Sequence, residues 1–197
     1  MRGVSLSIQR GEIVFIFGAS GAGKSTLLYT LAGLERPEEG EVLFEGQSLY
    51  RLSGDKLASL RNRRMGFIFQ SYCLLPELTA LENVALPARI AGREASAQAR
   101  ELLELVGLGH RLHHLPSELS GGERQRTAIA RALVNNPVII FADEPTGNLD
   151  SKTGTQILTL LLDVAKERKC TLLVVTHDRN LAEHGTRTIL IQDGQLI

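Results

Sequence analysis

The feature that most constrains the fold of this chain is a glycine-rich segment between an apolar strand pattern, residues 13–17, and an apolar helix pattern that ends near Gly33. The segment reads G-A-S-G-A-G-K-S-T and consists of Gly18, Ala19, Ser20, Gly21, Ala22, Gly23, Lys24, Ser25 and Thr26. Its three glycines allow positive φ and close backbone approach, so successive backbone N–H groups can turn toward phosphate oxygens at a helix N-terminus. A glycine-rich turn without a ligand is the alternative, but the full G-x-x-x-x-G-K-S pattern between a strand and a helix favours a phosphate-binding loop.

Two side chains of this loop suit a nucleoside triphosphate. Lys24 is expected to reach the β- and γ-phosphates, and the Ser25 hydroxyl is expected to complete the coordination of Mg²⁺. Kinases, GTPases and motor ATPases all use such a loop, so the rest of the chain must decide which reaction it serves.

The composition narrows the class of protein. The 197 residues suffice for one α/β domain with a smaller inserted lobe, and 22 basic and 22 acidic side chains give a net charge of zero, which provides no overall basic field for nucleic acid or anionic lipid. The apolar runs are strand-sized, below the ~18 residues of a membrane span, and we see no secretory signal. Cys73 and Cys170 lie far apart; we interpret both as buried or half-buried thiols of a reduced compartment.

The first third of the chain alternates strand and helix signals. Residues 4–8 have the period-2 pattern of a half-buried strand, which we expect to form a hairpin with residues 13–17 through a turn at Arg10-Gly11. Further elements are expected in this order: a strand at 41–45, a basic helix capped by Ser53 and extending through Arg64, and a strand at 65–69 that ends at Gln70.

From residue 71 to residue 119, helix patterns broken by Gly and Pro replace the strand patterns. Thr79 and Glu82 fit a capping box, and another helix covers 95–106. We interpret its apolar stripe as packing within the lobe, with a partner groove as the alternative. Three histidines lack acids or cysteines at ligand spacing and are interpreted as surface residues rather than a metal site: His110, His113 and His114. The segment therefore predicts an inserted helical lobe.

A second helix start follows this lobe. Ser120 and Glu123 fit another capping box, and Gly121 and Gly122 leave the N-terminal amides uncovered, ready for an anion. A well-capped helix without a ligand is the alternative. The remaining expected elements are a buried strand at 138–142, a helix at 151–168, a buried strand at 171–176, a short helix after His177, and a strand at 188–192 with a turn at 193–194. The alternation of strands and helices predicts a parallel α/β core.

Polar residues occur at several expected strand ends, which meet at one edge of a parallel sheet. Asp143 is expected to hold Mg²⁺, and Glu144 to orient and deprotonate an attacking water. Gln70 is expected to position that water or contact Mg²⁺, and His177 to donate to the γ-phosphate beside the Lys24 loop. Each residue alone has a structural alternative, such as a solvated turn for the Asp-Glu pair. Together they indicate nucleotide hydrolysis.

In its whole set of motifs the chain resembles the ATP-binding subunit of ATP-binding cassette (ABC) transporters. The motifs stand in that family's order: the phosphate loop, the Q-loop at Gln70, the signature LSGGERQR from Leu119, the strand VIIFADE, the D-loop GNLD and the switch residue His177. The resemblance implies an α/β fold of the P-loop NTPase type, with a mostly parallel core sheet, an antiparallel N-terminal β portion and an inserted helical subdomain. It implies one ABC ATPase domain, residues 1–197, in which 1–70 and 120–197 form the RecA-like core and 71–119 form the helical insertion.

The resemblance also implies how the two helix starts work together. In a head-to-tail homodimer that sandwiches two ATP molecules, Ser120, Gly121 and Gly122 of one subunit close on the γ-phosphate held by the other, and Asp150 of the D-loop lies at the nucleotide. ATP and Mg²⁺ are the expected ligands. The helical lobe is expected to receive an integral membrane permease near residues 70–86, on the cytoplasmic side of the inner membrane, with no direct contact to the transported substrate.

Within the family, LTALENVALP and DEPTGNLD are most similar to the group that contains the lipoprotein-release, macrolide-export and cell-division ATPases. Lipoprotein release is the leading expectation, and macrolide or peptide export and a regulatory role in cell division are the alternatives. ABC ATPases that act on DNA or ribosomes carry coiled-coil insertions or paired cassettes. This chain has neither, nor a basic stripe for nucleic acid.

The chain departs from the family pattern at one point. Family members have an aromatic residue on a strand before the phosphate loop, which stacks on adenine, whereas this sequence has no aromatic residue before Phe15. Phe15 and Phe17 are expected to face the core. We expect either a shortened sequence or another means of holding the base, and in the first case weaker ATP affinity with poor base selectivity, because one base–aromatic stack contributes ~1–3 kcal/mol.

Overall fold

The computed structural model of this protein describes residues 1, 3–177 and 184–197. Its central sheet has the strand order β4-β5-β6-β1-β7-β8, and all neighbouring strands are parallel except β7 and β8. The strands are β1 Ile13–Phe17, β4 Met65–Ile68, β5 Ile139–Asp143, β6 Thr171–Val175, β7 Arg187–Gln192 and β8 Gln195–Leu196. A separate antiparallel pair consists of β2 Leu43–Phe44 and β3 Gln47–Ser48. The predicted mixed α/β fold with a mostly parallel core is confirmed.

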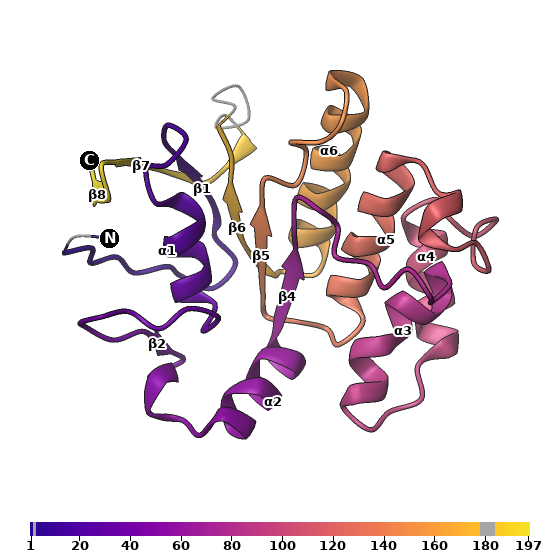
Figure 1. The fold of residues 1–197 in the computed structure, drawn as a ribbon, viewed down its shortest axis with the longest axis horizontal. Coiled ribbons are helices and arrows are strands. Elements are labelled where there is room, and N and C mark those ends of the chain that lie inside the picture. Colours follow the sequence, from indigo (N-terminus) through magenta and orange to yellow (C-terminus); the bar gives the residue numbers. More distant parts are fainter. Residues whose placement is uncertain (2, 178–183) are drawn as a thin grey trace.

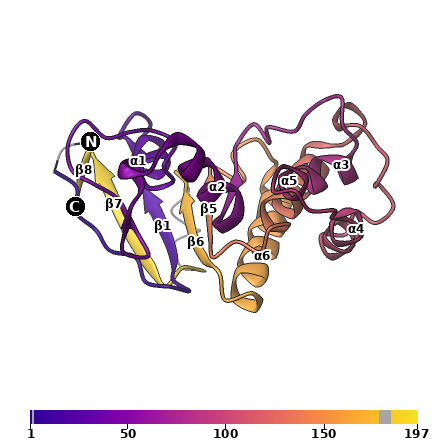
Figure 2. The ribbon, with the colours of Figure 1, turned by 90° about the horizontal axis from the view of Figure 1, so that it is seen from below.

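Helices cover both faces of this sheet, as Figures 1 and 2 show. They are α1 Lys24–Leu31, α2 Gly54–Arg64, α3 Ala80–Ile90, α4 Ser96–Leu105, α5 Gly121–Leu133 and α6 Ser151–Glu167, with short 3-10 turns η1 Leu49–Arg51 and η2 Pro116–Glu118. Alternate residues of β1 point to opposite faces: Val14 and Ile16 pack with α1, whereas Ile13, Phe15 and Phe17 pack with α5 and α6. All five are buried, as predicted for Phe15 and Phe17, because a central parallel strand has apolar neighbours on both sides.

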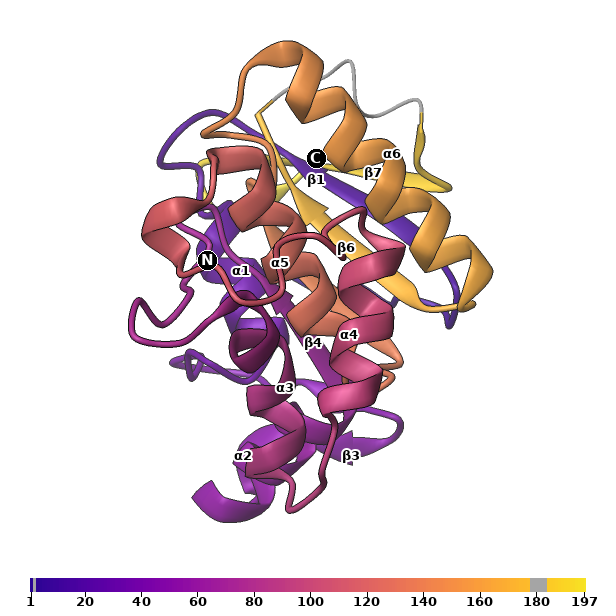
Figure 3. The same cartoon turned by 90° about the vertical axis from the view of Figure 1, so that its right-hand side faces the viewer.

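The helical segment joins the core through α5. This helix packs against β4 as well as α3, α4 and α6, and one apolar cluster continues from the sheet through Ile129 and Leu133 to Val84 and Leu103. Figure 3 shows α3, α4 and α5 side by side. Because the cluster is continuous, the packing marks no boundary between core and insertion, and the division at residues 71 and 119 stays a prediction.

The hairpin expected at the start of the chain is wrong. Val4, Leu6 and Ile8 are half-buried and the residues between them are exposed, as expected, but residues 4–9 do not form a strand. The reason is the position of β1, whose two edges are already paired with β6 and β7. A strand with both edges occupied has no backbone groups left for a hairpin partner.

The other expected elements are present with small differences at their ends. Ser53 is the N-cap of α2, although its hydroxyl makes no capping hydrogen bond. The capping box at Thr79 and Glu82 is complete. The interpretation of Cys73 as buried or half-buried is wrong, because it lies exposed in the loop after β4, whereas Cys170 is buried. The short helix expected after His177 lies outside the described residues.

No helix in the described ranges combines the length and apolarity needed to cross a bilayer.

Candidate functional site

The phosphate-binding loop connects the end of β1 to the start of α1. Gly21 and Gly23 adopt left-handed conformations with φ of 78° and 97°, which favour glycine. Gly18 is required for a different reason: a Cβ there would lie 2.3 Å from the carbonyl oxygen of Ile191 on β7. The loop is thus fixed both by turn geometry and by close contact with the neighbouring strand.

Lys24 is the first residue of α1 and is buried although it is charged. Its Nζ atom donates hydrogen bonds to the carbonyl oxygens of Gly18, at 3.0 Å, and Ala19, at 3.1 Å. Two carbonyl oxygens of the loop therefore hold the ammonium group of Lys24 on the inner side of the loop. No side chain caps the N-terminus of α1, and its first turn contains no acidic residue, so its amides and the positive end of the helix dipole are available to an anion.

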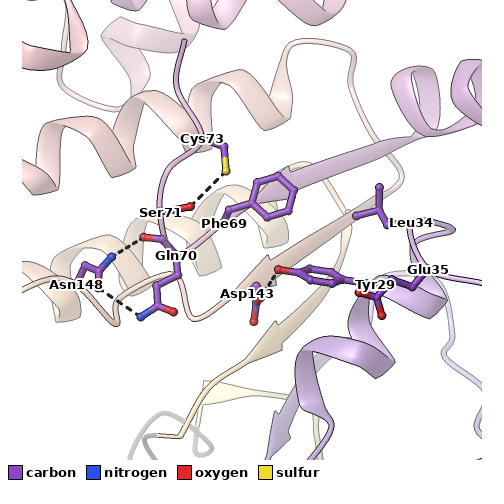
Figure 4. Close-up of a pocket in the computed structure, with 9 residues that line it drawn as sticks. All are labelled: Tyr29, Leu34, Glu35, Phe69, Gln70, Ser71, Cys73, Asp143 and Asn148. Carbon is purple, nitrogen blue, oxygen red and sulfur yellow. Dashed lines mark hydrogen bonds between the residues drawn. The ribbon is translucent and has the colours of Figure 1, made fainter. Parts of the chain in front are cut away.

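Asp143, at the carboxyl end of β5, is bound to α1 through both carboxylate oxygens, and Figure 4 shows the bond from Tyr29. Ser25 Oγ donates to Oδ1 at 2.9 Å, and the Tyr29 hydroxyl donates to Oδ2 at 2.6 Å. Burial and, secondly, the bond to Asp143 raise the pKa of Tyr29 above its ordinary value, so the phenol stays protonated and acts as the donor. The arrangement brings together Ser25 and Asp143, two of the three predicted magnesium ligands.

These oxygens fit a hard cation that takes few ligands from the protein. Ser25 and Asp143 supply adjacent oxygens beside the phosphate loop, and Mg²⁺ is usually held by one or two such groups together with substrate phosphates and waters. Across the part of the chain that the structure describes, no three or more His, Cys, Asp or Glu side chains form a group that could hold a metal. The chemistry at this point suits Mg²⁺ bound together with a nucleotide.

Glu144 follows Asp143 and pairs with His177. The Glu144 Oε2 atom lies 2.9 Å from His177 Nδ1, and the side chains are 14% and 68% exposed. Glu144 has a φ of 45°, a left-handed conformation that costs a residue with a side chain about 1–3 kcal/mol. Its backbone N–H donates to the Val175 carbonyl at the end of β6. The strained backbone and the short contact together bring the carboxylate and the imidazole to the same sheet edge.

Gln70 lies at this edge, and its hydrogen bonds go to Asn148 and not to Ser25 or Asp143. Its Nε2 atom donates to Asn148 Oδ1 at 3.3 Å, and Asn148 Nδ2 donates to the Gln70 carbonyl at 2.9 Å. Both residues line an open pocket of about 700 Å³ beside the phosphate loop. Its walls are Tyr29, Leu34, Glu35, Phe69, Gln70, Ser71, Cys73, Asp143 and Asn148 (Figure 4). Gln70 and Asp143 thus line the same pocket but are not hydrogen-bonded to each other.

The predicted signature residues lie elsewhere. Ser120 is the N-cap of α5, with a complete capping box to Glu123, which also forms an ion pair with Arg111 at 2.9 Å. A Cβ on Gly122 would lie 2.7 Å from Thr153 Cγ2 on α6. Figures 1 and 2 show the starts of α1 and α5 on opposite sides of β5 and β6. Within one chain, these residues do not reach the phosphate loop.

Asp150 caps the next helix. Its Oδ1 atom accepts a hydrogen bond from the Thr153 backbone N–H at 3.0 Å, and the hydrogen bonds from Thr153 lower the pKa of this exposed carboxyl. This contact accounts for the local role of Asp150, and its position at a nucleotide stays a prediction.

Sequence reasoning missed three residues that hold the site. Asn148 pairs with Gln70, and Arg131 donates to the carbonyl oxygens of Tyr72 and Cys73 in the loop that follows Gln70. Tyr29 binds Asp143. Only Tyr29 had a readable signal: it follows Ser25 by four residues, a spacing that puts both hydroxyls on one face of a helix.

Comparison with known proteins identifies the family. Residues 1–147 match the family described as ABC transporter. The chain belongs to the ABC transporter family. It is an ATP-binding subunit that hydrolyses ATP, as its family and its relatives show.

Two curated relatives match this ABC ATPase over its whole length. An uncharacterized ABC transporter ATP-binding protein of Thermotoga maritima is 56% identical over 100% of this chain and 85% of its own length. The lipoprotein-releasing system ATP-binding protein LolD of Myxococcus xanthus is 54% identical over 100% of this chain and 89% of its own. Among solved structures, the ATP-binding cassette MJ0796, a dimer in a post-hydrolysis state bound to ADP and Pi, matches with a TM-score of 0.89 and 46% identity over 97% of this chain and 85% of that one.

Proposed function

We propose that this ABC ATPase supplies the energy for releasing lipoproteins from the inner membrane. The observation that carries the proposal is the 54% identity, over the whole chain, to the lipoprotein-releasing ATP-binding protein of Myxococcus xanthus. A relative of that name from Shewanella denitrificans, 53% identical over 98% of this chain, supports the same assignment. Export of macrolides or peptides and regulation of cell division are the competing functions within this group.

We infer that two copies act as a head-to-tail dimer around two ATP molecules. Each chain has one phosphate loop with Lys24 and a second helix start at Ser120, Gly121 and Gly122 that is far from that loop. A second copy in the opposite orientation brings the missing helix start to each nucleotide and Asp150 to the same interface. The dimeric state of the MJ0796 cassette supports this arrangement.

The site residues then have distinct roles in hydrolysis. Lys24 and the amides of residues 18–26 bind the phosphates, while Ser25 and Asp143 hold Mg²⁺, which when bound neutralises phosphate charge. Glu144 accepts the proton of the attacking water. His177 orients Glu144 through the 2.9 Å contact and donates to the γ-phosphate as its charge shifts. Gln70 reaches this centre only after leaving Asn148, so its position depends on the conformational state of its loop.

The proposed partner is an integral membrane permease, which places the ATPase at the cytoplasmic face of the inner membrane. Residues 71–119 form the subdomain that receives the permease, near residues 70–86, and Gln70, Ser71 and Cys73 of that region line the pocket. The transported molecule contacts the permease and not this chain. With a net charge of zero, the chain is not expected to bind nucleic acid.

Light scattering in Mg-ATP tests the site. Glu144→Gln keeps the hydrogen-bonding geometry but removes the base, so hydrolysis should fall about 10²–10⁴-fold while ATP binding persists. We expect this variant to accumulate as a dimer. Glu167→Gln, at an exposed carboxylate on α6, serves as the control and should behave like wild type. A Glu144→Gln protein that hydrolyses ATP at the normal rate contradicts the role of Glu144.

A reconstituted release reaction tests the substrate. The ATPase is combined in proteoliposomes with a candidate permease from the same genome and with an acylated lipoprotein, and the lipoprotein freed in ATP is measured. Release with wild type and none with Glu144→Gln supports the proposal. ATP hydrolysis that a macrolide or a secreted peptide stimulates, without lipoprotein release, favours the export alternative.

A further inference from the structure

Tyr29 lines the pocket, and its hydroxyl donates a hydrogen bond to Asp143, the carboxylate of the proposed magnesium site. The two oxygens of Asp143 accept from two hydroxyls of the same helix, Ser25 on Oδ1 and Tyr29 on Oδ2. The two donors are four residues apart, so they lie on one face of α1, a turn from each other. The carboxylate is therefore held at both ends by α1.

This double contact fixes an angle that the side chain alone leaves free. Rotation of an Asp carboxylate about χ2 is broad, without sharp staggered minima. A charge-assisted hydrogen bond on Oδ2, at 2.6 Å, holds the group so that Oδ1 faces the Ser25 hydroxyl. The oxygen that faces the phosphate loop is thus oriented before any ligand arrives.

The ring of Tyr29 is itself fixed by aromatic neighbours. It meets Phe69 edge to face, with centroids 6.3 Å apart, and Phe69 stacks on Phe67 at 6.1 Å. Phe67 in turn stacks on Phe141 at 5.8 Å. Phe141 lies on β5 two residues before Asp143, so the chain of rings runs from α1 to the strand that carries the carboxylate.

Tyr29 also supplies a protein donor to Oδ2 beside the open pocket. Both Tyr29 and Asp143 line the open space of about 700 Å³, yet Asp143 is buried. With the phenol in place, pocket water does not have to satisfy Oδ2. Removing the hydroxyl leaves that oxygen to water, which binds less rigidly than a packed side chain.

We propose that Tyr29 is a positioning residue for the divalent metal of the ATPase reaction, acting by orienting Asp143 through its hydroxyl. The proposal rests on the proposed role of Asp143 as a metal ligand. Partners that orient metal ligands typically change metal affinity or activity by about 10–100-fold when they are removed. Tyr29 therefore affects the metal more than the nucleotide.

The test compares Tyr29→Phe with Tyr50→Phe. The Tyr50 hydroxyl also bonds next to α1, to the carbonyl oxygens of Thr30 and Glu35, but not to Asp143. Binding of Mn²⁺ in the presence of ADP is measured by electron paramagnetic resonance, and binding of ADP without metal by calorimetry. For Tyr29→Phe we expect Mn²⁺ affinity to fall about tenfold with metal-free ADP affinity unchanged, and the Mg²⁺ concentration for half-maximal hydrolysis to rise. Tyr50→Phe should match wild type.

Two further variants separate the possible failures. Asp143→Asn tests the metal role itself: if its Mn²⁺ affinity is unchanged, the proposed site is wrong. If Asp143→Asn loses Mn²⁺ binding and Tyr29→Phe does not, only the role of Tyr29 is overturned. Phe69→Leu keeps the hydroxyl but removes the edge-to-face contact, and it should weaken Mn²⁺ binding less than Tyr29→Phe. An equal or larger loss would assign the effect to ring packing and not to the hydroxyl.

Discussion

The N-termini of α1 and α5 have the same backbone dipole but opposite side-chain chemistry. At α1, Gly23 occupies the N-cap, no side chain caps the helix, and the buried ammonium of Lys24 follows directly. At α5, Ser120 and Glu123 cap one another, and Arg111 neutralises the Glu123 carboxylate. A helix start that leaves its amides free can hold an anion alone, whereas one that already contains a carboxylate retains only the amides of its glycines. We therefore propose that the first holds phosphates by itself and that the second does so only together with the loop of another copy.

The largest expected effect is a loss of ATP affinity at α1. Lys24→Ala removes the only cation of the loop, and ATP affinity should fall roughly 10–100-fold, because a hydrogen bond to a charged group contributes about 1.5–3 kcal/mol. Ser120→Ala should leave the ATP affinity of the single chain unchanged, since α5 does not reach the loop. Calorimetry on dilute protein measures both, with exposed Lys56→Ala as the charge-matched control. Equal losses in Lys24→Ala and Ser120→Ala would mean that both helix starts contact the nucleotide of one chain.

An effect of intermediate size tests whether Gly122 of α5 is needed for packing within the chain or for the approach of a ligand. Gly122→Ala places a methyl group 2.7 Å from Thr153 Cγ2, and such overpacking costs about 1–3 kcal/mol. Thr153→Ser removes that methyl, so the double variant should regain the thermal stability of wild type. If the backbone of Gly122 must also approach a phosphate of the second copy, the double variant in a Glu144→Gln background stays monomeric in Mg-ATP. A stable double variant that dimerises normally would reduce Gly122 to a packing residue.

The smallest effect concerns pH and exists at α5 but not at α1, whose first turn has no acidic residue. Hydrogen bonds from Ser120 and the nearby Arg111 lower the pKa of Glu123 below its value in the unfolded chain. Glu123 therefore stabilises the fold above its unfolded pKa, and this contribution is lost as the pH falls through the lower, folded pKa. At neutral pH, Glu123→Gln should lower Tm by about 2–4 °C, the shift that a capping loss of about 1 kcal/mol makes in a domain of this size.

Thermal unfolding of wild type and Glu123→Gln from about pH 7 to about pH 3 measures this effect. The two Tm values should converge in acid, where the wild-type carboxylate is protonated. Exposed Glu101→Gln on α4 is the control. A constant difference at all pH values would show that size or solvation, and not the charge of Glu123, stabilises the start of α5.

Much of the site could be predicted from local pattern. The loop from Gly18 to Thr26, both capping boxes and the strand that ends in Asp143 follow from residue types at fixed spacing, because turns and caps are local. The sequence did not reveal why some of these residues are required at their positions. Gly18 is required by the carbonyl of Ile191, a residue far along the chain. The pairing of Gln70 with Asn148 likewise joins two loops that only the sheet order brings together.

The sequence by itself determined the parallel α/β architecture, the identity of the phosphate loop and the presence of polar groups at several strand ends. The tertiary structure decided which of those groups touch. It paired β1 on both sides and so excluded the opening hairpin, put Tyr29 and Ser25 on the two oxygens of Asp143, and kept α5 away from α1. The physical reason is that periodicity and capping depend on neighbours within a few residues, whereas strand order and side-chain contacts depend on packing between segments more than a hundred residues apart.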